Sequence, residues 1–394
     1  MAIRHQLAVY SPIPIGAPMR GVAAALRLTR DPRPTLVDLL RADYGASAAL
    51  LTASGTQALQ IAIENAVHRV GAEGQTVALP AFSCFDVASA AIGANVSAAL
   101  YDLDPETLGP DLESLERVLA AGVRVVVIAP LYGMPVDWAE LDALAIQYNA
   151  TLIEDSAQGH GATWRGLPLG ALGEISTLSF GRGKGWTGGR GGAVLVRRRG
   201  SLDSTDLPHS EIAKEASTVV GLMAQWALGR PAVYGIPRSI PALGLGETTY
   251  HAPVPPTTMP RAAAAAVLRA IDPSRREAER RRENARWFLE RIPRDERVHS
   301  IRPVDGATPG YLRLPVRIAG GVMGMRPTSR ALALGIAQSY PCSLVQLAPR
   351  LSGPEQRWPG AEELARDLVT LPTHSRLTLA ERDEIVRMLH QKPR

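Results

Sequence analysis

The run Val123-Arg124-Val125-Val126-Val127-Ile128-Ala129 is a nearly continuous β-branched stretch in a chain of 394 residues. Such a run is typical of a parallel strand that is buried on both faces, because helices cover both sides of a parallel sheet. We therefore predict a central strand at Val123–Ala129.

Strands and helices alternate on both sides of this run. The other predicted strands are Ala48–Thr52, Thr76–Leu79, Val96–Tyr101, Ala150–Ile153, Ile175–Phe180 and Ala193–Val196. The predicted helices between them are Gln57–Val67, Phe85–Ile92, Leu112–Ala121 and Trp138–Tyr148. This succession predicts a doubly wound α/β sheet that binds its ligands at the carboxyl ends of the strands.

The second half of the chain has a different pattern. Residues 200–260 are interrupted by proline and glycine and could connect two domains. Helices are predicted near 261–271, 275–292, 328–335, 360–367 and 379–390, with a strand at Leu312–Val316. Because a chain of this length can form two domains, we predict a large domain of residues 1–240 and a smaller C-terminal α+β domain of residues 241–394.

The composition is that of a soluble globular protein, with 46% hydrophobic and 21% charged residues. The net charge of +5 comes from arginines spread along the chain, so we expect no nucleic-acid partner. The densest basic run, Ser274–Arg282, predicts a helix with one solvated basic face. Binding of RNA or an acidic membrane by this run is the alternative.

The two cysteines, Cys84 and Cys342, are far apart and have no metal-ligand spacing. They favour a reducing cytoplasm, and we expect neither a disulfide framework nor a metal site. No uninterrupted apolar run reaches the length of a membrane span.

Only three lysines occur in the sequence, namely Lys184, Lys214 and Lys392. Lys184 lies in the glycine-rich stretch LSFGRGKGWTGGRGGAV at 178–194. Arginine cannot replace lysine as an amine nucleophile, because its guanidinium stays protonated. The stretch does not fit a Walker loop, since no hydroxyl residue follows the lysine and a strand is predicted next. We interpret Lys184 as a lysine that forms a Schiff base with pyridoxal 5'-phosphate (PLP). A solvated loop lysine is the alternative.

Asp155 follows a predicted buried strand and begins the segment Asp155–Gly161, DSAQGHG. A carboxylate at such a strand end can pair with the pyridine nitrogen of PLP, and Gln158 can donate to the ring hydroxyl. The alternative for Asp155 is a helix cap or a turn residue. His160 is more often a packed or capping histidine than a catalyst.

The segment Ser54-Gly55-Thr56 joins a predicted strand to a predicted helix. Free backbone N–H groups and the helix dipole make such a turn an anion site. Ser54 or Thr56 could instead simply cap the helix. Ser179, five residues before Lys184, could add a hydroxyl to a bound phosphate.

Taken in order, these motifs resemble those of the DegT/DnrJ/StrS family of PLP-dependent sugar aminotransferases, which has the aspartate-aminotransferase fold (fold type I). The resemblance covers most of the chain. It rests on SGTQAL at 54–59, PAFSCFDVASAA at 80–91, IEDSAQGHGA at 153–162, the Lys184 stretch, GIAQSYP at 335–341 and PGAEELARDLVTLPTHSRLT at 359–378.

The resemblance implies a role for each site residue. Lys184 would form the internal aldimine and then act as general base and acid. Asp155 would bind the ring nitrogen and Gln158 the ring oxygen. Gly55, Thr56 and Ser179 would hold the phosphate, and Ser54 and Cys84 would also belong to the cofactor-binding residues. The family typically transfers an amino group from glutamate to a nucleotide-linked keto-sugar, and it usually forms a homodimer with active sites at the interface.

Two positions depart from the family pattern. Cys84 stands where an aromatic residue often stacks on the cofactor ring, and Phe82 or Phe85 could substitute for it. The segment Val254–Met259 lacks the asparagine–arginine pair that often reaches the phosphate from the partner subunit.

We therefore expect an aminotransferase that acts on a keto-sugar for a surface polysaccharide or a secondary metabolite. A different PLP reaction or acceptor on the same scaffold is the second hypothesis. A cofactor-binding regulator without turnover is the third. Retention of Lys184 argues against a dehydratase of this fold, which generally has histidine at that position.

Overall fold

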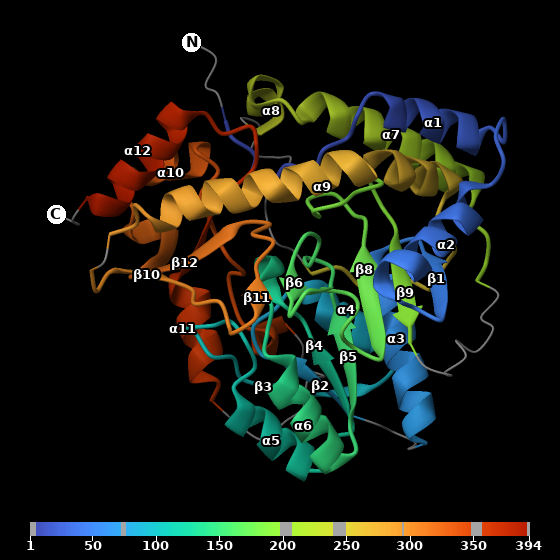
Figure 1. The fold of residues 1–394 in the computed structure, drawn as a ribbon, viewed down its shortest axis with the longest axis horizontal. Coiled ribbons are helices and arrows are strands. Elements are labelled where there is room, and N and C mark those ends of the chain that lie inside the picture. Colours follow the sequence, from blue (N-terminus) through green and yellow to red (C-terminus); the bar gives the residue numbers. More distant parts are fainter. Residues whose placement is uncertain are drawn as a thin grey trace.

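The structure is a computed structural model, and it describes residues 5–71, 76–197, 207–238, 250–293, 295–347 and 357–391. Its strands form a seven-stranded sheet, a four-stranded sheet and a small three-stranded sheet, and helices pack around them (Figure 1). The predicted domain boundary at 240/241 lies outside the described residues, and the two-domain division stays a prediction.

The seven-stranded sheet has the strand order β1-β9-β8-β5-β4-β2-β3. Its strands are β1 (Ala48–Thr52), β2 (Thr76–Pro80), β3 (Ser97–Tyr101), β4 (Val125–Ile128), β5 (Thr151–Asp155), β8 (Ile175–Ser179) and β9 (Gly192–Val196). Neighbouring strands from β8 to β3 are parallel, whereas β9 is antiparallel to both β1 and β8. The sheet is therefore mixed, and all seven predicted strands are present.

Strand β4 lies in the interior of the sheet, between β5 and β2, next to the central strand β5, and it is buried along its whole length. Val125 and Val127 belong to a core formed with helices α3 and α4, whereas Val126 and Ile128 belong to a core formed with α5 and α6. These helices are α3 (Gly55–Val70), α4 (Phe85–Gly93), α5 (Leu112–Ala120) and α6 (Trp138–Tyr148). Because alternate side chains point to opposite faces of a strand, the sheet is covered on both faces, as a doubly wound sheet requires.

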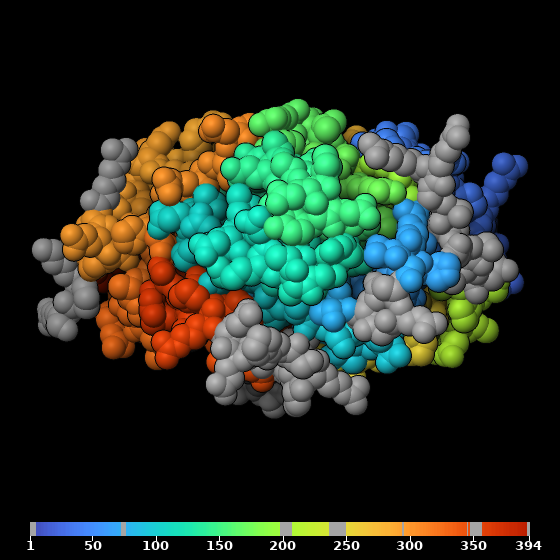
Figure 2. All heavy atoms as spheres, turned by 90° about the horizontal axis from the view of Figure 1, so that it is seen from below, coloured from blue at the N-terminus to red at the C-terminus, as the bar shows by residue number. Residues whose placement is uncertain are grey.

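The four-stranded sheet has the order β10-β12-β14-β13 and is antiparallel. Its strands are β10 (Val298–Ser300), β12 (Leu314–Ile318), β13 (Ala337–Gln338) and β14 (Leu368–Leu371). The helices of this part are η3 (Gly321–Gly324), α10 (Thr328–Ala333), η4 (Leu344–Leu347), α11 (Pro359–Asp367) and α12 (Leu379–His390). In Figure 2 these C-terminal residues, coloured orange and red, lie to one side of the teal and green middle of the chain.

Three short strands join the two parts of the chain. β6 (Thr163–Trp164) pairs with β7 (Leu167–Pro168) and with β11 (Ala307–Thr308), which comes from the C-terminal part. A short 3-10 helix, η1 (Leu131–Gly133), follows β4.

Helix α9 (Arg261–Leu289) is one continuous helix of 29 residues with Pro273 inside it. We predicted two helices separated near this proline, and that prediction is wrong. Packing along the whole helix outweighs the hydrogen bond that proline removes. Ala263 and Val267 join a core with the N-terminal part, whereas Ala285 and Phe288 join the core of the C-terminal part.

The basic face of α9 is only partly solvated. Arg275, Arg276 and Arg280 are exposed, as predicted, but Arg281 has no exposed surface. Its guanidinium donates to the carbonyl oxygen of Tyr10 over 2.7 Å. Burial lowers the pKa of Arg281 to about 10.

Helices α1, α2, α7 and α8 complete the set of described helices, and α1, α7 and α8 had no counterpart in the sequence-based prediction. Their bounds are α1 (Gly16–Ala25), α2 (Pro32–Tyr44), α7 (Ile212–Leu228) and α8 (Pro231–Arg238). Figure 1 shows α1 and α7 side by side on the far side of α9 from the large sheet. Both helices expose some large apolar residues, for example Met19 at 67% and Val220 at 66%, so the periodicity of a buried face is weak.

Candidate active site

One pocket lies where the parallel strands of the large sheet end. It contains about 490 Å³ of space free of protein atoms, part of it open to solvent. The residues that line it follow β2, β4, β5 and β8 or begin α3 and α4. They are Gly55, Thr56, Leu59, Ser83, Cys84, Asp86, Val87, Ala129, Pro130, Leu131, Asp155, Ala157, Gln158, Ser179 and Lys184. Of the eight predicted site residues, all except Ser54 line this pocket.

Asp155 is the last residue of β5, and its side chain is held from two directions. Its Oδ1 atom accepts hydrogen bonds from the backbone N–H of Ala157 and from the hydroxyl of Thr177, each over 3.1 Å. Burial raises the pKa of Asp155, and the charge of Lys184 is the largest of the effects that oppose this rise. A strand-end carboxylate in such a position can hold a positive charge in the pocket.

The neighbouring carboxylate, Glu154, has a different environment. Its side chain has no exposed surface and accepts five hydrogen bonds. The donors are the hydroxyls of Ser156 and Ser176 and the backbone N–H groups of Gly170, Leu172 and Gly173. Glu154 therefore holds the loop before β8 in place and does not face the pocket.

The N-terminus of α3 forms the second wall of the pocket. The hydroxyl of Ser54 accepts a hydrogen bond from the backbone N–H of Gln57 over 3.2 Å, and so Ser54 caps the helix. Gly55 and Thr56 line the pocket instead, together with Ser179 from the end of β8. A Cβ atom on Gly55 would lie 2.6 Å from the Cβ atom of Ser179, so only glycine fits between the helix and the strand.

The loop that carries Lys184 runs from β8 to β9. Gly183, Gly189 and Gly191 adopt positive φ angles of 76°, 78° and 113°, which favour glycine. The carbonyl oxygen of Lys184 accepts a hydrogen bond from the hydroxyl of Ser11. The side chain of Lys184 lines the same pocket as Asp155, so the amine and the carboxylate share one cleft.

Gln158 lies at the side of the pocket, between the two sheets. Its Oε1 atom accepts a hydrogen bond from the backbone N–H of Tyr132 over 2.8 Å. Its Nε2 atom donates to the hydroxyl of Tyr340 over 2.7 Å. The side-chain amide is therefore fixed at both of its polar atoms.

Cys84 precedes α4 and lines the pocket. Burial raises the pKa of its thiol to about 11, so the thiol is neutral at physiological pH. Phe82 and Phe85, which could have replaced the stacking aromatic residue, do not line the pocket and belong to the hydrophobic core.

His160 does not line the pocket. Its ring lies 5.6 Å from that of Trp186, and burial lowers its pKa to about 3. A neutral, packed histidine fits this environment. This agrees with the interpretation of His160 as a packed histidine and not as a catalyst.

Several pocket residues were not identified from the sequence. Ser83, Asp86 and the segment Ala129–Leu131 line the pocket beside the predicted residues. Thr177 binds Asp155 because the two residues are paired between β5 and β8. This contact follows from the strand register, and the sequence carries no signal for it beyond the two strands themselves.

A comparison with known protein families finds one match to this part of the chain. Residues 37–203 match the model of the DegT/DnrJ/EryC1/StrS aminotransferase family. This segment belongs to that family. The matched segment includes α3, all seven strands of the large sheet and every residue that lines the pocket.

Curated proteins match part of the chain. An L-glutamine:2-deoxy-scyllo-inosose aminotransferase of Streptomyces lividus is 38% identical over 157 residues, which are 40% of this chain and 36% of that protein. A 3-amino-5-hydroxybenzoate synthase of Amycolatopsis mediterranei is 37% identical over 163 residues, with 39% of each chain covered. The chain thus spans less than half of the length of these relatives.

Solved structures resemble the whole chain. The sugar aminotransferase CalS13 from Micromonospora echinospora has a TM-score of 0.74 at 21% identity and covers 97% of this chain and 98% of its own. DesI, solved in the presence of its TDP-sugar product, has a TM-score of 0.73 at 19% identity, with 99% and 93% coverage. This likeness confirms the predicted fold, the fold type I of PLP-dependent transferases with its doubly wound mixed sheet.

Proposed function

We propose that this protein is a PLP-dependent aminotransferase that moves an amino group from glutamine or glutamate to the keto group of a cyclic polyhydroxy acceptor. The observation that carries the proposal is the meeting of Lys184, Asp155 and the N-terminus of α3 in one pocket. The family match of residues 37–203 and the names of the relatives support the same reaction class.

The residues of the pocket suit PLP. The N-terminus of α3 offers N–H groups to a phosphate, and the close contact of Gly55 with Ser179 leaves a cradle that a side chain would fill. Ser83 Oγ is buried beside the pocket without a hydrogen-bond partner among the described residues. When bound, PLP would supply an aldehyde and an electron-withdrawing ring.

Each residue has a proposed task. The Lys184 amine would hold the cofactor covalently and, when released, carry a proton between carbon atoms of the substrate. Asp155 would keep the ring nitrogen protonated, because its carboxylate lies at the end of β5 in a partly buried position. Gln158 would donate to the ring oxygen. Gly55, Thr56 and Ser179 would hold the phosphate, with Ser54 fixing the helix that presents them.

The acceptor belongs to one of two chemical classes. The curated relative from Streptomyces lividus is named for 2-deoxy-scyllo-inosose, and that name contains no nucleotide. DesI was solved with a TDP-sugar. We propose a cyclic ketone of this general kind, either a free cyclitol ketone or a nucleotide-linked keto-sugar, in secondary-metabolite or surface-polysaccharide biosynthesis.

The cofactor assignment is tested first. Purified protein mixed with PLP should show an absorption band near the visible edge, and borohydride reduction should fix the cofactor to Lys184, as located by peptide mass spectrometry. Lys184→Ala should abolish the band. Lys214→Ala is the matched control, because Lys214 contacts Thr257 in a different part of the chain and does not line the pocket. A band that survives Lys184→Ala would exclude Lys184 from its role.

The reaction is tested by its two halves. Glutamine and glutamate should each be compared for conversion of the bound cofactor into its amino form. Free cyclitol ketones and nucleotide-linked keto-sugars should then be compared as acceptors in the second half-reaction, which returns the cofactor from its amino form to its aldehyde form. Conversion without return by any cyclic ketone would favour a different acceptor, and no conversion by any amino acid would favour a cofactor-binding regulator.

We further propose a cytoplasmic homodimer with active sites at the subunit interface. Both cysteines are free thiols, which fits a reducing compartment. Among the described helices, none is long and apolar enough to cross a bilayer. Light scattering of the purified protein tests the dimer, and a monomer with full activity would contradict it.

A further inference from the structure

Tyr340 reaches the candidate site from the four-stranded sheet, whereas the pocket residues belong to the large sheet and its flanking helices and loops. It follows Ser339, whose backbone N–H donates to the carbonyl oxygen of Leu368 in β14 over 2.9 Å. Tyr340 is 8% exposed and does not line the pocket itself. It can therefore affect a bound cofactor only through a residue that does.

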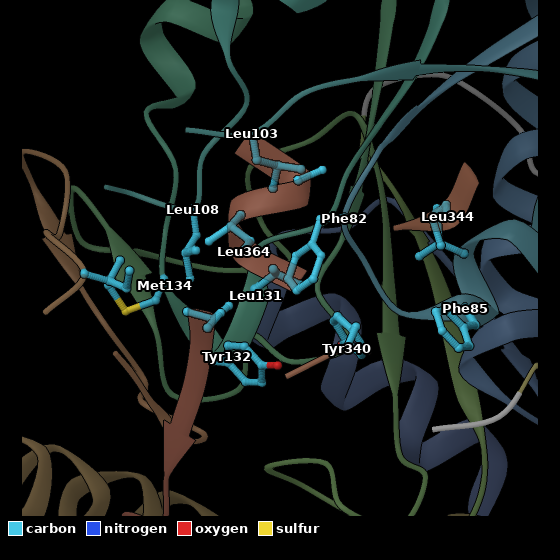
Figure 3. Packing of buried hydrophobic residues seen from close by; sticks show 14 of the residues in the cluster. Phe82, Phe85, Leu103, Leu108, Leu131, Tyr132, Met134, Tyr340, Leu344 and Leu364 are labelled. Carbon is cyan, nitrogen blue, oxygen red and sulfur yellow. The ribbon is translucent and has the colours of Figure 1, made fainter. Parts of the chain in front are cut away.

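Three aromatic rings fix the ring of Tyr340. The ring centroids of Phe82, Phe85 and Tyr132 lie 5.5, 6.4 and 6.4 Å from it. Figure 3 shows Tyr340 between Phe85 on one side and Tyr132 and Phe82 on the other. Burial raises the pKa of Tyr340 well above its usual value, so its hydroxyl stays protonated. The position of the hydroxyl is thus set by packing, and a neutral O–H group can accept a hydrogen bond there.

The two contacts of Gln158 decide which end of its amide faces which way. A backbone N–H can only donate, so the Gln158 atom that lies 2.8 Å from the N–H of Tyr132 must be the oxygen. The nitrogen therefore faces the hydroxyl of Tyr340, at 2.7 Å. An amide nitrogen carries two hydrogens, and in the described ranges of the chain only one of them has a partner. Because Gln158 lines the pocket, the second can donate to a ligand there.

We propose that Tyr340 is a positioning residue that makes Gln158 a hydrogen-bond donor toward the ring oxygen of bound PLP. The inference rests on the proposed function. With Tyr132 and Tyr340 both in place, the Gln158 amide cannot rotate to present its oxygen. A donor at this point stabilises negative charge on the ring oxygen, and so it sets the pH at which the absorption of bound PLP changes.

The experiment compares Tyr340→Phe with the wild-type protein, both loaded with PLP. The variant keeps the packed ring and removes only the hydroxyl. It should weaken PLP binding about three- to tenfold, as expected for one neutral hydrogen bond. It should also shift the pH midpoint of the absorption change by about half to one unit. Tyr101→Phe is the matched control. It removes a buried hydroxyl that donates to the carbonyl oxygen of Val127 over 2.7 Å, and neither residue lines the pocket.

A second comparison asks whether Tyr340 acts through Gln158. In a Gln158→Ala background, Tyr340→Phe should change neither the PLP affinity nor the pH midpoint, since the residue that it positions is gone. Undiminished shifts in that background would overturn the inference. Equal midpoints for wild type, Tyr340→Phe and Tyr101→Phe would overturn it as well.

Two further outcomes are separated by the same measurements. If Tyr340→Phe does not fold, Gln158→Met, which has no amide, must shift the midpoint in the same direction, and an unshifted midpoint would overturn the inference. If wild-type protein shows no PLP band, the proposed function fails and the inference fails with it. A wild-type band with no effect of Tyr340→Phe leaves the proposed function intact and removes the inference alone.

Discussion

Gly55 and Ser179 lie so close together that a Cβ atom on Gly55 would be only 2.6 Å from the Cβ atom of Ser179. This contact joins the first turn of α3 to the end of β8, at the wall of the pocket proposed to hold a phosphate. Gly55→Ala should therefore force the helix and the strand apart. We expect a loss of about 1–3 kcal/mol in the free energy of unfolding and at least about tenfold weaker PLP binding. Urea unfolding and PLP titration measure the two effects.

A double variant distinguishes the steric effect of the added methyl group from the loss of a phosphate-binding side chain. Ser179→Gly, added to Gly55→Ala, removes the side chain that the new methyl group meets, and it should restore stability but not PLP affinity. Gly221→Ala in α7 is the matched control, because no atom lies within 4 Å of its added Cβ atom and alanine favours a helix. A destabilised Gly221→Ala protein together with an unchanged Gly55→Ala protein would contradict this account.

Asp155→Asn should have opposite effects on stability and on function. Burial raises the pKa of Asp155, so the ionised form is disfavoured in the folded protein without cofactor. The stability contributed by its protonated form is present at low pH and is lost as the pH rises from the unfolded pKa through the raised folded one. At pH 7 the variant without cofactor should therefore unfold at a temperature equal to or above that of the wild type.

The same variant should lose PLP chemistry, because a neutral amide cannot hold the protonated ring nitrogen. We expect activity to fall by about 100-fold or more. The measurements are thermal unfolding of the cofactor-free proteins and turnover of the loaded ones. Asp38→Asn, at an exposed position in α2, is the control. Full activity of Asp155→Asn would remove Asp155 from the proposed site.

Glu154→Gln should destabilise the fold strongly, even though it changes one atom type. The carboxylate accepts five hydrogen bonds and has no exposed surface, and an amide would set its own N–H group against some of these donors. We expect a loss of about 2–4 kcal/mol in the free energy of unfolding. Glu113→Gln, which breaks an exposed pair with Arg117, should cost less than about 0.5 kcal/mol in the same urea titration. Similar costs for the two variants would contradict the role of Glu154.

His374 should make the protein lose stability in mild acid. Its Nδ1 atom accepts from the backbone N–H of Arg376 over 3.3 Å, and its Nε2 atom lies 2.9 Å from the carbonyl oxygen of Leu7, where it must donate. Both contacts are satisfied by the neutral ring, and burial lowers its pKa to about 4. A histidine whose pKa is lowered on folding contributes stability above its unfolded pKa of about 6.5, and that stability is lost as the pH falls toward 4.

Urea midpoints between pH 4 and 8 measure this effect. The wild type should lose up to about 1.4 kcal/mol per pH unit for each such histidine below pH 6.5. His374→Asn should start from a lower stability at pH 8 but show a flatter pH profile. His390→Asn, at an exposed position in α12, should keep the wild-type slope. A wild-type slope in His374→Asn would show that this ring does not titrate on unfolding.

Much of the fold was predictable because the large sheet has strong local signals. The β-branched run around Val126 is buried on both faces, and the turns after β5 and before α3 lie where parallel strands end. Seven of the eight predicted site residues line one pocket for this reason. Ser54 was harder to assign, because a serine before a helix can cap it or face a ligand, and only the contact with Gln57 shows the cap.

The parts that sequence could not reveal depend on contacts between distant segments. Tyr340 is 182 residues away from Gln158, and no periodicity links them. Pro273 predicted a helix break, but packing against both parts of the chain keeps α9 continuous. Arg281 looked like one more solvated cation of a basic run, and its burial follows only from the position of the N-terminal segment at Tyr10.

Helix α9 has a consequence for how the chain folds as it is synthesised. One hydrophobic core combines Leu36 and Leu40 of α2 with Leu195 of β9 and with Ala263 and Val267 of α9. The early residues of this core leave the ribosome more than 200 residues before the late ones. Since N-terminal segments generally begin to fold first, the apolar residues of β1, β8 and β9 in this core stay uncovered by α9 until that helix has been synthesised. A nascent chain stalled before residue 261 should therefore recruit chaperones, and one stalled well beyond residue 289 should not.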